Sequence, residues 1–264
     1  MQQSNQPTIH VPLNNNELLK QTLERVNSNE EILTLWNILN VNAIDRLAMT
    51  DHGPVHFQIV SNIALRILRI LRKHKVEMSI VKNFKLTDDH AEVVVLLASV
   101  LHDIGMSIHR ANHEEYSLFL ANPLLHELLS FLPIKERTIV ISDTLHAIIS
   151  HRSDGRPLTI EAGIVRVADA LDMSAGRSRI PYEAGKVNIH SLSAYAIEGI
   201  EILEGHERPV QINVSMINSA GIFQVDELLK EKLANSGIEK YFEIKAFIKG
   251  KTEKKLLKEF IIKY

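Results

Sequence analysis

The sequence predicts a mainly α-helical protein, with a helical bundle over residues 15–184 and a small α+β domain over residues 185–264. Up to about residue 175, apolar residues recur at the three- and four-residue spacing of amphipathic helices. From there on, short runs rich in β-favouring residues take over, and some alternate apolar with polar residues. We therefore place the domain boundary near residue 185. Residues 1–14 are mostly polar and are expected to form a flexible, loosely held tail.

Polar capping residues open the first predicted helices. Ser28 followed by Glu31 fits a capping box at the start of a short helix. Asp51 can cap a longer helix that runs to about Lys73 and holds Pro54 in its first turn. Proline is tolerated at this position because it lacks only an N–H group that has no partner inside the helix.

The middle of the chain holds the most apolar of the predicted helices. We expect a loop over residues 74–86, after which Thr87 opens a helix with the body AEVVVLLASVL. A helix that is apolar nearly all round is expected at the centre of the bundle, and Gly105 ends it. Further helices are expected over residues 110–121, 123–132, 135–150 and 159–173.

The C-terminal part contains the β-favouring runs. These runs are IEGIEILEG, PVQINVSMI, YFEIKAFIKG and KEFIIKY. The segment DELLKEKLAN, between the second and third runs, is typical of a helix. We expect this helix to pack on one face of a small sheet.

The composition excludes several classes of function. A net charge of −2 argues against a broad nucleic-acid-binding surface. Because the chain has no cysteine, disulfides and thiolate metal sites are excluded, and any metal site must use imidazole, carboxylate, amide or water ligands. No run approaches the ~18 apolar residues that a membrane span needs. The N-terminus lacks a basic-then-apolar signal pattern, so the expected compartment is the cytoplasm.

Histidine is concentrated in one part of the chain, since ten of the 13 histidines lie in residues 52–151. The pair His102-Asp103 stands at the end of the apolar central helix, while His56 and Asp169 belong to two other predicted helices. All of these residues have strongly apolar neighbours. A buried imidazole or carboxylate without a partner is energetically costly, and a shared divalent cation would satisfy all four groups at once.

The order His…His-Asp…Asp resembles the HD-domain superfamily of metal-dependent phosphohydrolases. The local context is similar too, because His56 precedes IVSNIA, His102-Asp103 precedes IG, and Asp169 lies in ADALD. The resemblance covers roughly residues 45–180. It implies a helical HD domain in which these four residues bind a divalent metal ion.

A second metal ion is implied by a partial resemblance to the HD-GYP branch of this superfamily. The segment SHRSDGRP at residues 150–157 is similar to the branch's HHExxDGxGYP, with His151 at one of the paired histidine positions and Ser150 at the other. Arg156-Pro157 stands where Gly-Tyr-Pro would begin, so the GYP element is absent. This departure argues against cleavage of cyclic di-GMP.

Other histidines are candidates for completing the second metal site. His113, in ANHEEYS, is the best candidate for the intervening ligand. His146 precedes His151 by five residues and could approach the same cavity, while His109 is four residues before His113. The alternative for His146 and His109 is a surface or capping role. With two ions bound, Asp103 would bridge them.

Two further residues are expected to act beside the metal. His52 lies one turn before His56 and is expected to contact metal or substrate, the alternative being a helix cap. Asp172 lies one turn from Asp169 and is expected to support a metal ligand, the alternative being a solvated residue. With Asp103, these two residues make up the predicted catalytic group.

Phosphate recognition needs cations or N–H donors. Several arginines fall beside the proposed site segments, namely Arg110, Arg152, Arg156, Arg177 and Arg179. For any single arginine, a solvated surface position is the alternative. The mixed imidazole and carboxylate ligands suit Fe, Mn, Zn, Co or Ni, and the sequence does not choose between one ion and two.

The resemblance implies a metal-dependent phosphohydrolase that cleaves a phosphate ester of a nucleotide or similar small molecule through a metal-bound hydroxide. One alternative is a cyclic nucleotide or cyclic-dinucleotide phosphodiesterase with a binuclear site. The other is a non-catalytic HD protein that binds a nucleotide or partner and regulates without turnover. The expected partner is a phosphorylated small molecule and not a membrane, and the α+β domain makes a homodimer reasonable.

Overall fold

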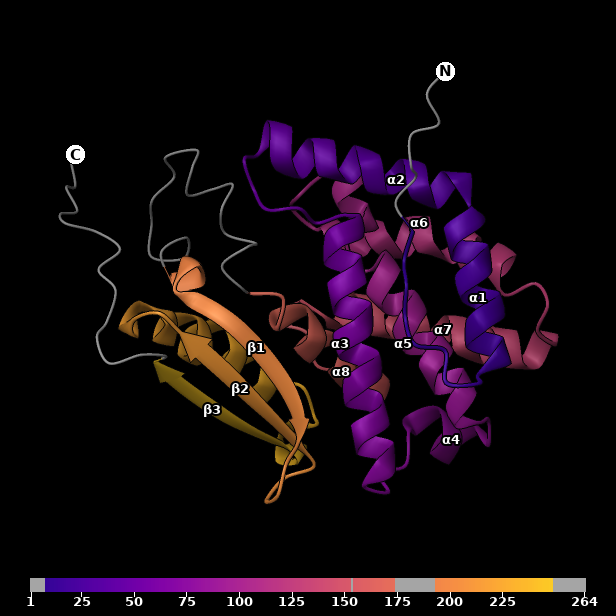
Figure 1. Ribbon diagram of the computed structural model, residues 1–264. Coiled ribbons are helices and arrows are strands. Elements are labelled where there is room, and N and C mark those ends of the chain that lie inside the picture. The colour runs from indigo at the N-terminus through magenta and orange to yellow at the C-terminus, as the bar shows by residue number, and fades with distance from the viewer. Residues whose placement is uncertain (1–7, 153, 174–192, 249–264) are drawn as a thin grey trace.

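The computed structural model describes residues 8–152, 154–173 and 193–248. A bundle of helices lies beside a small three-stranded sheet (Figure 1). This mainly α arrangement, with a small α+β unit at the C-terminal end, confirms the predicted fold class. The predicted domain boundary near residue 185 lies outside the described residues.

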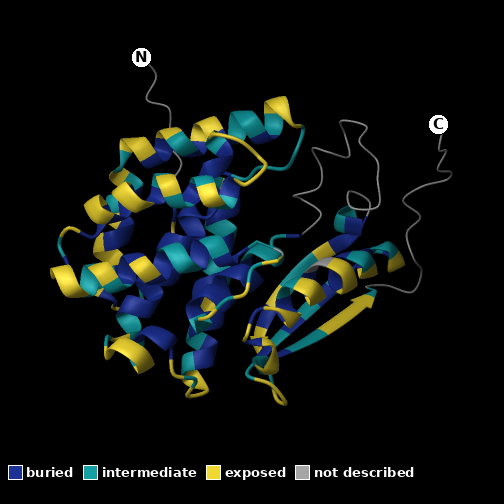
Figure 2. Cartoon of the chain, turned by 180° about the vertical axis from the view of Figure 1, so that it is seen from behind, coloured by how far each residue is buried: buried dark blue, intermediate teal, exposed yellow. Residues whose placement is uncertain are grey.

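The bundle is built around one buried helix. Its α-helices are α1 (Glu17–Ser28), α2 (Glu30–Asn40), α3 (Pro54–Lys73), α4 (Ser79–Phe84), α5 (Asp88–Leu101), α6 (His113–Leu128), α7 (Ile134–Ser150) and α8 (Ile160–Ala170). Every residue of α5 from His90 to Leu101 is buried, and α5 packs against α1, α3, α7 and α8. Figure 2 shows the buried residues gathered inside the bundle. The predicted central helix is therefore confirmed.

The apolar character of α5 reflects its place in the core. The stretch Asp88–Ser107 is long and apolar enough to cross a membrane, but 94% of its apolar window is buried inside the fold. A helix buried in a protein core can have the same length and apolar composition as a membrane span. Thr87 opens α5 as predicted, in a capping box in which its N–H donates to Nδ1 of His90 (3.3 Å).

The N-terminal segment is packed from Thr8 onward, which corrects the expectation of a loosely held tail for this part. Ile9 is fully buried. Its N–H donates to Oδ1 of Asn27 (2.8 Å), and the Asn27 side chain donates back to the Ile9 carbonyl (2.9 Å). The partly buried Val11 and Leu13 also pack against the core, and hydrogen bonds between His10 and Gln58 tie the segment to α3. Residues 1–7 lie outside the described residues.

Other details of the bundle also differ from expectation. Asn29, and not Ser28, caps α2, because its side chain accepts the Ile32 N–H (2.9 Å). The predicted loop over 74–86 contains α4, whose first two N–H groups donate to the carboxylate of Glu161 (3.2 and 3.1 Å). The two helices expected over 110–132 are one helix, α6, with Pro123 inside it.

Three strands form the sheet, namely β1 (Ile197–Glu204), β2 (Val210–Met216) and β3 (Phe242–Ile248). β1 pairs antiparallel with β2, and β2 pairs in parallel with β3. A parallel pair needs a crossover connection, and the predicted helix supplies it as a π-helical turn, Gln224–Leu229, that continues into α11 (Lys230–Ala234). The fourth β-favouring run, at residues 258–264, lies outside the described residues.

The α+β unit is anchored on α8, the helix that carries Asp169. A Cβ on Gly163 of α8 would lie 2.5 Å from a backbone oxygen of the segment after α11, so glycine permits this close approach. The fully buried Arg166 donates from Nε to the Lys232 carbonyl (2.9 Å) and from Nη1 to the Gly155 carbonyl (2.9 Å). The guanidinium thus joins α8, α11 and the turn after α7.

Candidate metal centre

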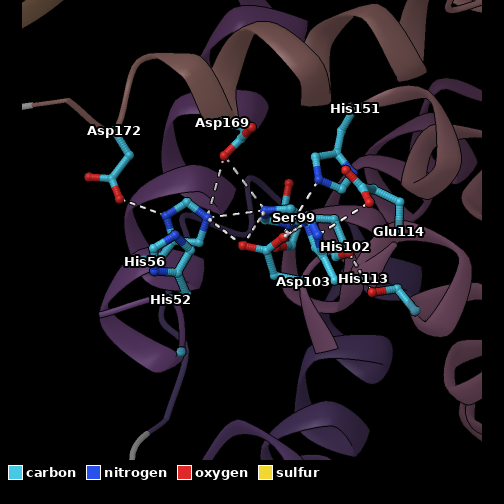
Figure 3. A network of polar contacts seen from close by, with 12 residues as sticks. His52, His56, Ser99, His102, Asp103, His113, Glu114, His151, Asp169 and Asp172 are labelled. Atoms are coloured by element: carbon cyan, nitrogen blue, oxygen red, sulfur yellow. Dashed lines mark hydrogen bonds and ion pairs between the residues drawn. The ribbon is translucent and has the colours of Figure 1, made fainter. Parts of the chain in front are cut away.

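Imidazole and carboxylate side chains from several helices meet in one cluster at the end of α5 (Figure 3). The cluster consists of His56 in the first turn of α3, His102 and Asp103 after α5, His113 at the start of α6, His151 after α7 and Asp169 in the last turn of α8. All are buried except Asp169, which is partly exposed. Helix ends from distant parts of the sequence therefore build the site.

The two carboxylate oxygens of Asp103 face different histidines. Oδ2 lies 3.8 Å from Nε2 of His56 and 3.7 Å from Nε2 of His102. Oδ1 lies 2.9 Å from Nε2 of His113 and 3.5 Å from Nε2 of His151. This arrangement divides the cluster. We call His56, His102 and Asp169 with Oδ2 of Asp103 the inner half, and His113 and His151 with Oδ1 the outer half.

In the inner half, Nε2 of His56 and Nε2 of His102 lie only 3.0 Å apart. Oδ1 of Asp169 lies 3.5 Å from the first nitrogen and 3.7 Å from the second. The other ring nitrogens face acceptors, because Nδ1 of His102 lies 3.0 Å from the Ser99 carbonyl and Nδ1 of His56 lies 2.6 Å from Oδ2 of Asp172. In the neutral tautomers that donate these hydrogen bonds, the Nε2 lone pairs point at one another.

The outer half follows the same pattern. Nδ1 of His151 lies 2.6 Å from a carbonyl oxygen in the last turn of α7. Nδ1 of His113 lies 3.0 Å from the Arg110 carbonyl and 3.2 Å from Oε2 of Glu114. Nη1 of Arg110 also lies 2.8 Å from this nitrogen, but two acceptors, one of them charged, favour a proton on it. Both Nε2 lone pairs then converge on the shared carboxylate.

Facing lone pairs repel one another unless positive charge lies between them. The pKa shifts in the cluster show that its surroundings favour such a positive charge. Although burial lowers the pKa of His102, Asp103 and Asp169 raise it to about 9. Burial would raise the pKa of Asp103, but His102 and His113 hold it well below its usual range. Burial would likewise raise the pKa of Asp169, but Lys232 holds it well below its usual range. Imidazole nitrogen and carboxylate oxygen are ligands that divalent transition metals prefer, so both halves fit such ions.

The turn after the His-Asp pair brings the two halves together. A Cβ on Gly105 would collide with the His113 carbonyl oxygen and lie 2.5 Å from the Ser117 nitrogen. The Gly105 N–H donates to Oγ of Ser117 (2.9 Å), and this hydroxyl donates to the His102 carbonyl (2.6 Å). Glycine thus allows α6 to begin against the end of α5, which places His113 beside Asp103.

A cavity of about 150 Å³ opens onto the outer half. Its lining residues are His52, Asp103, Arg110, His113, Glu114, His151, Arg152, Asp169 and Lys232. Apart from the histidines, three of these residues are basic, namely Arg110, Arg152 and Lys232. Such a small, highly charged cavity suits a phosphate group with its metal ions better than a large apolar ligand.

His52 and Asp172 both lie beside the cluster. His52 lines the cavity, its ring centroid lies 5.7 Å from that of His56, and its Nδ1 lies 2.8 Å from the Thr50 carbonyl. Oδ2 of Asp172 contacts Nδ1 of His56 and therefore orients that ring toward the inner half.

Two histidines considered as ligands lie outside the cluster. Nε2 of His146 accepts the Leu158 N–H (2.9 Å), and Nδ1 of the exposed His109 accepts the Ala111 N–H (3.0 Å). The expectation of a ligand role for His146 is therefore corrected. α7 runs to Ser150 and His151 is its C-cap, so the five-residue spacing places the two side chains about 140° apart around the helix and does not bring the rings together.

The predicted substrate-binding arginines are dispersed. Arg110 and Arg152 line the cavity, and Arg152 also forms ion pairs with two neighbouring carboxylates (2.6 and 2.7 Å). Arg156 is exposed and is not part of the cavity lining, which corrects its expected role. Arg177 and Arg179 lie outside the described residues.

Two residues beside the cluster, Glu114 and Lys232, were not predicted from the sequence. A carboxylate oxygen of Glu114 lies within 4.8 Å of ligand atoms of His113 and His151, and its place next to His113 could have indicated it. Lys232 gave no signal, because it belongs to a charged helix 63 residues after Asp169.

The fold and the cluster together define a helical domain in which one aspartate lies between two sets of histidines that could hold metal ions. A family model described as HD domain matches residues 56–174, which include the whole cluster. The uncharacterized protein MJ1020 of Methanocaldococcus jannaschii is 41% identical over 244 residues, which cover 92% of this chain and 93% of that protein. The chain belongs to the HD-domain superfamily, as its motifs predicted. Proteins of this family bind divalent metals and are generally metal-dependent hydrolases.

Proposed function

We propose that the protein is a metal-dependent phosphohydrolase that cleaves a phosphate ester of a nucleotide or similar small molecule. The observation that carries this proposal is the position of Asp103 between two sets of imidazoles. In two-metal hydrolases, a pair of ions ~3.5–4 Å apart clamps the attacking and leaving oxygens. One ion would be held by the inner half and the other by the outer half, with Asp103 as the bridge.

Hydrolysis joins a water oxygen to phosphorus and breaks the bond to the ester oxygen, which leaves with a proton. Bound divalent ions supply Lewis acidity and lower the pKa of water. Arg110, Arg152 and Lys232 surround the cavity with positive charge that attracts phosphoryl oxygens. His52 lines the same cavity, where it would contact the substrate and exchange a proton with the leaving oxygen.

The donor set suits Fe, Mn, Zn, Co or Ni, and one or two of these ions are part of the proposal. We place the enzyme in the cytoplasm, with a phosphorylated small molecule, foremost a nucleotide, as its partner and no membrane partner. The α+β unit is the part of the chain that we assign to a homodimer interface. The division into a helical domain up to residue 184 and an α+β domain from residue 185 is likewise proposed.

A cyclic nucleotide or cyclic-dinucleotide phosphodiesterase is the second candidate. That reaction class needs a binuclear site, and the outer half formed by His113 and His151 favours it. The Ser150 hydroxyl faces His146 (3.4 Å) and adds nothing to the outer half, whereas Glu114 offers a further oxygen there. A regulatory HD protein would bind metal and nucleotide in the same place without turnover.

The test combines metal analysis after anaerobic reconstitution with a hydrolysis screen of nucleotides, cyclic nucleotides and cyclic dinucleotides. We expect two equivalents of metal and turnover of at least one substrate, and Asp103→Ala should abolish both. His126→Ala is the matched control, because His126 is exposed on α6, the helix that begins with His113. Absence of metal after reconstitution, or activity that survives Asp103→Ala, would overturn the proposal. Nucleotide binding without hydrolysis would favour the regulatory alternative.

A further inference from the structure

The α+β unit contributes a side chain to the metal centre. Nζ of Lys232, on α11, lies 3.0 Å from Oδ2 of Asp169 and 2.5 Å from the His151 carbonyl oxygen. The side chains of Lys232 and Asp169 are only 17% and 19% exposed. A largely buried ammonium with two acceptors differs from the exposed lysine–carboxylate pairs that contribute little to stability.

Hydrogen bonds fix both the backbone of Lys232 and its ammonium group. The buried Arg166 donates from Nε to the Lys232 carbonyl (2.9 Å). Nη1 of Arg166 donates to the carbonyl oxygens of Arg152 and Gly155, in the turn that follows His151. Both ends of the Lys232 residue are therefore tied to the elements that carry Asp169 and His151. The position of the ammonium is set by the docking of α11 on α8.

The two oxygens of Asp169 have different partners. Oδ2 accepts from Lys232, while Oδ1 lies 3.5 Å from Nε2 of His56 and 3.7 Å from Nε2 of His102. The terminal torsion of an aspartate is broad, so an unrestrained carboxylate can rotate and exchange its oxygens. The contact with Lys232 fixes which oxygen faces the imidazoles. Asp172 plays the corresponding part for His56 from the end of α8.

We propose that Lys232 is a positioning residue of the metal centre, through which the α+β unit orients the Asp169 carboxylate for metal binding by the inner half. This inference rests on the proposed function insofar as it requires a metal ion in the inner half. Partners that orient metal-binding side chains commonly change metal affinity or activity by about 10–100-fold. The HD-domain helices are then not sufficient for full metal affinity, because a helix outside the matched residues 56–174 completes the site.

Two effects of the ammonium oppose each other. Its charge repels a nearby cation, while its hydrogen bond holds the ligand in place. The Asp169 carboxylate lies between Lys232 and the two imidazoles, and its negative charge offsets the repulsion. We therefore expect the orienting effect to dominate. The sign of the change in metal affinity on removing the ammonium decides between these effects.

The experiment is calorimetric titration of Mn²⁺ into the metal-free, full-length protein. Lys232→Met should weaken Mn²⁺ binding by about 10–100-fold, and Lys232→Arg, which can donate to the same oxygen, should restore most of the affinity. Lys230→Met is the matched control, since Lys230 lies on the same helix, is 71% exposed and pairs with Asp226 (2.7 Å). This control should bind Mn²⁺ like the wild type. Thermal unfolding of each metal-free variant separates lost affinity from lost fold.

Lys232→Leu, which likewise has neither a donor nor a charge, replaces Lys232→Met if the latter fails to fold, with weakened binding again expected. Wild-type or tighter Mn²⁺ binding in the folded variant without the ammonium overturns the inference and leaves the proposed function intact. A wild-type protein that binds no divalent transition metal overturns both. Equal weakening by Lys230→Met would show a general charge effect and would also overturn the inference.

Discussion

The inner and outer halves of the candidate metal centre share one carboxylate but differ in their access to the cavity. The inner imidazoles, His56 and His102, lie on or directly after α3 and α5, in the core of the bundle, and are not part of the cavity lining. The outer imidazoles, His113 and His151, stand where α6 begins and where α7 has ended, and both line the cavity. All four imidazoles are buried at helix ends, but only the outer pair lines the cavity, so the outer half is the half whose imidazoles a substrate can reach.

The largest effect is expected where the two halves are joined. Gly105→Ala should destabilise the fold by about 3 kcal/mol or more, because the new Cβ collides with backbone atoms of α6 that cannot move without shifting His113. Thermal unfolding measures this loss. Gly199→Ala is the control, since its Cβ would meet the Ser215 hydroxyl oxygen at an ordinary 3.4 Å. Equal unfolding temperatures for the two variants would show that the close approach of α6 is not required.

The next effect separates the halves from each other. His113→Ala should remove one equivalent of metal and leave the ion of the inner half, because Oδ2 of Asp103 keeps its own partners. His56→Ala should remove the other equivalent. Metal analysis after dialysis measures both variants. Loss of all metal from His113→Ala would mean that the halves bind as one unit, which contradicts the division drawn here.

A smaller effect compares the carboxylates that orient the two sets of imidazoles. Asp172→Asn should weaken metal binding in the inner half by about 10–100-fold, because Asp172 lies 2.6 Å from Nδ1 of His56 and its side chain is 2% exposed. Glu114→Gln should have a weaker effect on the outer half, since this contact is 3.2 Å and the Glu114 side chain is 13% exposed. Titration with Mn²⁺ ranks the two variants, and the reverse order would contradict the comparison.

The smallest effect concerns a buried carboxyl outside both halves. Burial, and secondly Glu161, raise the pKa of Asp143 to about 6, in contrast to Asp103, which the imidazoles keep ionised. Because the pKa of Asp143 is raised in the folded state, protonation favours folding. The stabilisation that protonated Asp143 gives is fully present below its unfolded-state pKa near 3.8 and is lost as the pH rises through the folded-state pKa of about 6.

Asp143→Asn should therefore raise the unfolding temperature by a few degrees at pH 8 and change it little at pH 4. Thermal unfolding at the two pH values checks this expectation. Asp226→Asn serves as the exposed control and should show no such pH dependence, since Asp226 is 54% exposed. A lower unfolding temperature for Asp143→Asn at pH 8 would mean that the ionised carboxyl is stabilising.

The sequence was informative where a ligand belongs to a strongly patterned helix. The order of His56, His102-Asp103 and Asp169 in apolar helices predicted both the superfamily and the convergence of these side chains. It failed where closeness along the chain was used in place of the helix face. His146 and His151 are five residues apart and therefore point about 140° apart around α7, so one ring joins the cluster while the other accepts the Leu158 N–H.

Lys232 shows a second limit of prediction from sequence. Its ammonium reaches Asp169 because α11 docks on α8 through the close approach at Gly163 and the hydrogen bonds of Arg166. This docking depends on the three-dimensional fit of two units, and no local pattern in DELLKEKLAN records it. The same reason explains why the sequence did not predict the packing of Ile9 against α1.

The central claim is that Asp103 bridges two metal ions, and anomalous diffraction from crystals of the Mn²⁺-loaded protein tests it most directly. We expect two manganese peaks per chain, ~3.5–4 Å apart, one on each oxygen of Asp103. One peak would be surrounded by His56, His102 and Asp169, and the other by His113 and His151. A single peak, or peaks that do not contact Asp103, would contradict the claim.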